Sequence, residues 1–143
     1  MPPTLTVESY LAALDPVSAA GINALRQVVT GCHDDLVEQI KWNAPSFSHL
    51  GEDRVTLGVD RSRGFRVVLH RGAKPRDATG FSFLDNSGLA TWPAPDRAVI
   101  ALGDQQGIEA NAEALGVLLA RWIKATAEDI KTPAAHVRSS RPP

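Results

Sequence analysis

The stretch Arg54-Val55-Thr56-Leu57-Gly58-Val59 decides the fold class together with the stretch Phe65-Arg66-Val67-Val68-Leu69-His70. In both stretches apolar side chains recur at every second position, which is the period of a β-strand with one buried face. The segment between them, Asp60-Arg61-Ser62-Arg63-Gly64, is rich in turn-forming residues. We therefore expect a β-hairpin in the middle of the chain, with Arg66 and His70 on the face opposite the apolar residues.

Two further short strands are expected after the hairpin, at residues 89–92 and 97–102, where Pro93-Ala94-Pro95 separates them. Residues 71–88 read as a long loop. The part before the hairpin is less regular. Residues 34–40 fit either a helical turn or the start of a strand. Residues 42–50 are loop-like because Pro45 interrupts them, with a short extended piece at 46–49.

Helices are expected at both ends of the chain. Thr6 is a suitable N-cap for a first short helix, and Asp15-Pro16 opens a second that Gly31 can end. Asp104 can cap a last helix at residues 105–127, where apolar residues follow helical spacing. The predicted order is α-α-β-β-β-β-α. The fold class is therefore α+β, an antiparallel sheet with the N-terminal helix pair and the C-terminal helix covering one face.

The bulk composition limits the function classes. The chain has 143 residues, which suits one domain, predicted at 1–130 with a flexible tail at 131–143. Its net charge is −1, which offers no general attraction for nucleic acid. One cysteine, Cys32, excludes an internal disulfide and fits a reducing compartment. With no signal peptide and no apolar run of about 20 residues, we expect a soluble cytoplasmic protein.

Several segments taken together resemble a known family. They are Val7-Glu8-Ser9-Tyr10-Leu11, Ile40-Lys41-Trp42-Asn43-Ala44-Pro45-Ser46-Phe47, Val67-Val68-Leu69-His70-Arg71-Gly72-Ala73-Lys74, Gly88-Leu89-Ala90-Thr91-Trp92, Asp96-Arg97-Ala98-Val99-Ile100 and Arg121-Trp122-Ile123-Lys124. In order and spacing they resemble the YdhG-like bacterial family, a domain of unknown function, over residues 7–123. The resemblance implies a frataxin-like α+β sandwich. The family's usual residue after the Lys-Trp pair is glycine, where this chain has Asn43.

One candidate binding site combines cations, an imidazole and an aromatic ring. If the ends of the predicted strands converge, they form a pocket for a small anionic or aromatic ligand, because arginine binds carboxylate or phosphate bidentately and tryptophan offers a flat apolar wall. The structural alternative is that Asp96 and Arg97 pair with each other or cap a turn, and that Trp42 packs in the core. The candidate ligand-binding residues are Lys41, Trp42, His70, Arg71, Asp96 and Arg97.

A second candidate is a metal site at His33, Asp34, Asp35 and Glu38. Carboxylates suit hard cations and imidazole suits iron or zinc. Some YdhG-like proteins are described as frataxin-like iron chaperones, so the resemblance implies iron as the alternative cofactor or cargo. The structural alternative is an acidic first turn of a helix, which the helix dipole favours.

No catalytic motif stands out in the chain, and we assign no catalytic residue. The prediction is a non-enzymatic module that binds a small molecule or a protein partner, not nucleic acid or membrane. An iron carrier and an uncharacterised enzyme are the alternatives. The sheet face that carries Arg66, Val68 and His70 could also pair two copies, so a monomer and a homodimer both stay open.

Overall fold

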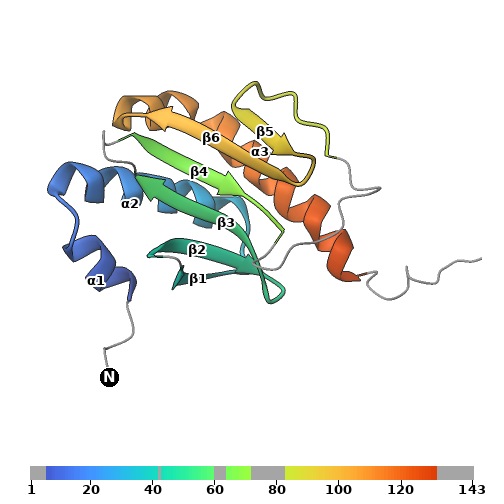
Figure 1. The fold of residues 1–143 in the computed structure, drawn as a ribbon, viewed down its shortest axis with the longest axis horizontal. Helices are drawn as coiled ribbons and strands as arrows, with labels where there is room; N and C mark the ends of the chain where they lie inside the picture. Colours follow the sequence, from blue (N-terminus) through green and yellow to red (C-terminus); the bar gives the residue numbers. More distant parts are fainter. Residues whose placement is uncertain (1–5, 42, 60–63, 72–82, 132–143) are drawn as a thin grey trace, which may run out of the picture.

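The computed structural model describes residues 6–41, 43–59, 64–71 and 83–131, with side chains described up to residue 127. Within these ranges the chain forms three helices and a sheet (Figure 1). The helices are α1 (Val7–Ala12), α2 (Pro16–Cys32) and α3 (Gln105–Lys131). The strands are β1 (Leu36–Lys41), β2 (Ala44–His49), β3 (Glu52–Val59), β4 (Phe65–Leu69), β5 (Ala90–Ala94) and β6 (Arg97–Gly103).

The predicted helix starts are confirmed by their caps. The Thr6 hydroxyl accepts a hydrogen bond from the Ser9 amide, and the Asp15 carboxylate accepts one from the Ser18 amide with Pro16 in the first turn. Asp104 accepts one from the Gly107 amide at the start of α3. Each side-chain oxygen satisfies an amide that has no partner inside its own helix.

The sheet is antiparallel throughout, with strand order β1-β2-β3-β4-β6-β5. Helices α2 and α3 pack against each other and lie on one side of the sheet, where α2 contacts β3 and α3 contacts β6 (Figure 1). The predicted α+β class, with helices from both ends covering an antiparallel sheet, is confirmed. We call the sheet face under α2 and α3 the helix face, and the opposite face the pocket face.

The apolar residues of the hairpin lie on the helix face, as their period-two pattern predicts. Val55 pairs with Leu69, and Leu57 pairs with Val67. All four are fully or almost fully buried, and they join the core formed with α2 and α3. The largest side chain of that core is Trp122 of α3, whose indole N–H lies 3.2 Å from the Arg54 carbonyl and 3.3 Å from the His70 carbonyl. The tryptophan thus attaches α3 to the paired strands β3 and β4.

Strand alternation predicts the wrong face of the sheet for Arg54. Strict alternation places Arg54 opposite Val55, on the pocket face, but its side chain is fully buried and one guanidinium nitrogen lies 3.4 Å from the Thr126 carbonyl of α3. The reason is a bulge, because the β2–β3 register shifts between Phe47 and Ser48. A bulge adds one residue to a strand and resets its alternation. It therefore turns Arg54 to the helix face and Asp53 to the pocket face.

The number of strands is also larger than predicted. Residues 34–40, which fitted either a helical turn or a strand, provide β1, and the region read as a loop around Pro45 is β2. The two strands form a hairpin in which Lys41 pairs with Ala44. Pro45 is tolerated because it is the second residue of β2, and pairing with β3 begins only at Ser46. Asn43, just before β2, has φ 58°, a backbone conformation that asparagine and glycine adopt most readily.

The C-terminal helix runs to Lys131, so it is longer than the predicted 105–127. Residues 132–143 of the predicted tail lie outside the described residues, as do residues 72–82 of the predicted loop. Across the described ranges, no helix combines the length and apolar character needed to cross a membrane.

Candidate functional site

A pocket of about 480 Å³ lies on the pocket face of the sheet. Strands β3, β4 and β6 contribute its floor, while α1 and the β1–β2 turn contribute one wall. This volume suits a small molecule. The described residues that line it are Tyr10, Asn43, Ala44, Thr56, Leu57, Gly58, Val59, Arg66, Val68, His70 and Arg97.

A chain of hydrogen bonds runs across the strands beside this pocket. The Lys41 ammonium donates to Asp53 at 2.7 Å, and the Ser46 hydroxyl donates to the other Asp53 oxygen at 2.9 Å. Ser46 lies 3.3 Å from the Thr56 hydroxyl, which lies 2.9 Å from Nε2 of His70. Asp53, Ser46 and His70 are buried. Because the bulge turns Asp53 to this face, its carboxylate can accept the hydrogen bonds from Lys41 and Ser46.

The donors and acceptors along these contacts are consistent with the tautomer of His70 that carries a proton on Nε2. Ser46 has one hydroxyl proton and gives it to Asp53, so its contact with Thr56 requires Thr56 to donate. Thr56 then accepts the proton of His70 Nε2. With that proton on Nε2, Thr56 is the acceptor in its contact with His70. The hydrogen bonds link β2, β3 and the end of β4 beside the pocket.

Two arginines supply positive charge to the pocket. The side chains of Arg66 on β4 and Arg97 on β6 are exposed, and neither forms a hydrogen bond or ion pair with any part of the chain that the structure describes. Both belong to the pocket face by strand alternation. Tyr10 of α1 belongs to the wall. Burial raises the pKa of Tyr10, so its phenol stays protonated and can donate a hydrogen bond.

The structure brings together only part of the predicted ligand set. His70 and Arg97 line the pocket, and Lys41 lies beside it, where its ammonium donates a hydrogen bond to Asp53. Asp96 forms an ion pair with Arg71 at 3.1 Å, and not with Arg97 as the structural alternative expects. Trp42 lies outside the described residues.

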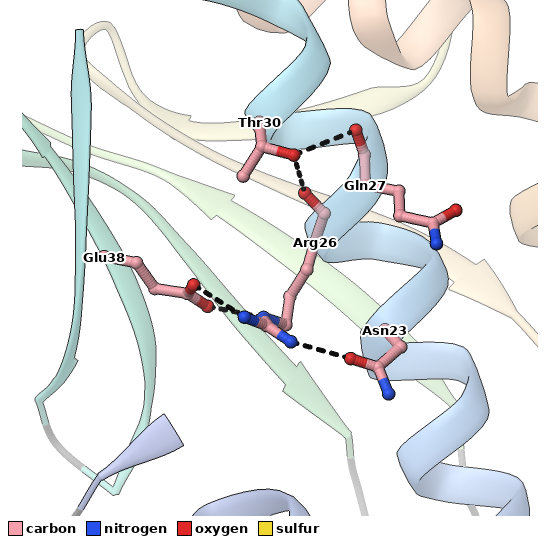
Figure 2. A network of polar contacts seen from close by, with 5 residues as sticks. All are labelled: Asn23, Arg26, Gln27, Thr30 and Glu38. Atoms are coloured by element: carbon pink, nitrogen blue, oxygen red, sulfur yellow. Dashed lines mark hydrogen bonds and ion pairs between the residues drawn. The ribbon is translucent and has the colours of Figure 1, made fainter. Parts of the chain in front are cut away.

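The predicted metal residues lie around the start of β1 rather than on a helix. The carboxylate of Glu38 is held by Arg26 of α2 through two bonds, of 2.7 and 2.9 Å, and Arg26 also donates to Asn23 (Figure 2). The hydrogen bond to Glu38 raises the pKa of Arg26. A bidentate pair of this kind occupies both carboxylate oxygens.

The other three residues of the predicted metal site are His33, Asp34 and Asp35. Nδ1 of His33 accepts a hydrogen bond from the Asp35 amide, while the ring packs edge-on against His49 with the centroids 4.6 Å apart. The side chains of Asp34 and Asp35 are exposed. Within the described ranges, no group of three or more histidine, cysteine, aspartate or glutamate residues is arranged to hold a metal ion.

Several residues of the site escape sequence reasoning. Asp53 reaches the pocket face through the bulge, and Ser46 reaches it through a strand that the sequence presents as a loop. Tyr10 is 46 residues before Thr56, and the two line the same pocket only in the folded chain. Arg66 was placed on the His70 face from alternation, and that signal would have been enough to add it to the candidate set.

No family model, curated protein or solved structure matches this chain.

Proposed function

We propose that this chain is a YdhG-like, non-enzymatic binding module that holds a small anionic molecule on its pocket face. One observation carries the proposal: Arg66 and Arg97 line a pocket of about 480 Å³ and have no anionic partner among the described residues. A guanidinium is always charged and presents several N–H donors in a plane, which suits carboxylate and phosphate oxygens.

The surroundings favour an anion over a cation. Asp53 is the acidic side chain of the hydrogen-bond chain beside the pocket, and Lys41 neutralises it at a distance of 2.7 Å. Asp96, next to Arg97 in sequence, is paired with Arg71. Among the residues that the structure describes here, Arg66 and Arg97 therefore carry the charges without an opposite partner. Hydroxyl donors such as the Tyr10 phenol can complete the coordination of an anion.

The test is a titration of the isotope-labelled protein with acetate and with inorganic phosphate, followed by backbone amide NMR. We expect saturable shifts at the amides of residues on the pocket floor, such as Gly58 and Val68. Arg66→Gln and Arg97→Gln should each weaken binding about tenfold, because each removes a charge-assisted hydrogen bond.

A matched control is Lys124→Gln, which removes an exposed cation from α3, on the other side of the sheet. It should leave the affinity unchanged while altering the net charge by the same amount. Shifts that fail to saturate, or that respond equally to Lys124→Gln and to the arginine variants, would show general charge attraction and reject the proposed function.

A further inference from the structure

The two arginines stand at opposite ends of the pocket floor. Arg66 pairs with Gly58 on one side and with Ala101 on the other. Leu69 pairs with Ala98, so the next position along each strand brings His70 beside Arg97. His70 is four positions after Arg66, just past the end of β4, which corresponds to about 13 Å at roughly 3.3 Å per residue. The backbone positions of the two arginines therefore lie far apart on the pocket floor.

The Arg66 side chain leans across the sheet rather than along it toward Arg97. Its Nε lies 3.2 Å, and its Cζ 3.8 Å, from the position that a Cβ of Gly58 would take. The absence of a side chain at Gly58 thus makes room for the arginine over β3, on the side where Ala44 and Tyr10 form the wall. This placement keeps the guanidinium at its own end of the pocket.

The floor between these two ends carries no charge. Val68 lies midway between Arg66 and His70 on β4, and Thr56 is its partner on β3. Thr56 is already engaged by Ser46 and His70, and Val68 is half-buried and apolar. A ligand that spans the pocket meets a cation at each end and an apolar surface with a hydroxyl in the middle.

From this geometry we infer that the ligand is a linear molecule with an anionic group at each end and a short apolar middle, of the dicarboxylate class. The inference rests on the proposed function and adds the arrangement of charge in the ligand. One anion meets Arg66 beside Tyr10. The other meets Arg97 beside His70, and the methylene chain lies over Val68.

The experiment compares α,ω-dicarboxylates of increasing length (succinate, adipate, suberate) with hexanoate, a monocarboxylate that matches adipate in carbon number. Binding is measured by amide NMR on the full chain, in wild type and in the Arg66→Gln, Arg97→Gln and Lys124→Gln variants. We expect affinity to peak at one length, and the best dicarboxylate to bind at least about tenfold more tightly than hexanoate.

In both arginine variants this advantage over hexanoate should disappear, while Lys124→Gln should retain it. Amide shifts should also appear together at both ends of the floor, near Ala101 and near Ala98. If hexanoate binds as well as every dicarboxylate, and phosphate still depends on both arginines, a single anion bridges them and the two-ended ligand is wrong, although the proposed function stands. If no anion binds in an arginine-dependent way, both ideas fail.

Discussion

Gly21 offers a sharp test of how closely α2 packs on the sheet. A methyl group added at this buried glycine would lie well inside van der Waals contact with the ring of Phe65 on β4. Phe65 is only 2% exposed and belongs to the core, so its ring has little room to move. Gly21→Ala therefore forces either the helix or the ring to shift.

The expected size of the effect follows from two opposing terms. Overpacking a core costs about 1–3 kcal/mol, and three atoms of the ring meet the new methyl group, so we take the upper part of that range. Replacing glycine by alanine inside a helix recovers about 1 kcal/mol. The net loss in the free energy of unfolding should therefore be about 1–2 kcal/mol.

Gly116 in α3 provides the matched control. A Cβ there would lie 3.9 Å from the nearest neighbouring atom, a methyl carbon of Val28, which is ordinary contact. Gly116→Ala should then stabilise the protein by about 0.5–1 kcal/mol, because only the helix term remains. Urea unfolding followed by circular dichroism measures both variants against wild type.

A double variant identifies the cause. Phe65→Leu removes the ring that meets the new methyl group, so Gly21→Ala should cost less in that background, with a coupling of at least about 0.5 kcal/mol. The reasoning is refuted if Gly21→Ala gains stability as Gly116→Ala does, or if the two changes at Gly21 and Phe65 are simply additive.

Two further predictions concern single titrating groups. Burial raises the pKa of Asp85, but hydrogen bonds from Ser87 and Trp92 outweigh it and leave that pKa below its usual value. The carboxylate therefore stabilises the fold above about pH 4, and this contribution is lost as the pH falls through its folded value. Asp85→Asn should lose less free energy of unfolding than wild type as the pH falls below about pH 4, measured by urea unfolding followed by tryptophan fluorescence. If the variant and wild type lose the same free energy over this pH range, the prediction is wrong. Burial also raises the pKa of the half-buried Cys32 thiol, so Ellman's reagent should react more slowly with the folded than with the urea-unfolded chain at neutral pH, and equal rates would contradict it.

Local patterns were sufficient for much of the fold. The alternation in the β3–β4 hairpin predicts which residues face the core, and the pairing of Val55 with Leu69 confirms it. Caps at Thr6, Asp15 and Asp104 predict where the helices start. These features depend on residues close together in the chain, so they can be read from the sequence itself.

The candidate site was only partly predictable. Alternation placed Arg66 and His70 on one face, and the structure finds both in the pocket. The sequence could not foresee that Arg71 is taken up by Asp96, 25 residues away, or that Glu38 is held by Arg26, because both partners come from other elements. Pairs of this kind depend on which strands and helices become neighbours.

The amino-acid sequence by itself determined the α+β class, the central hairpin and the helices at each end, since periodicity and capping are local properties. The tertiary structure decided what the pocket face contains. A one-residue bulge in β3 exchanges the faces of Asp53 and Arg54, which leaves the carboxylate beside the pocket and the guanidinium against α3. A single register shift reverses which side chains face the ligand, and only the paired strands establish where that shift lies.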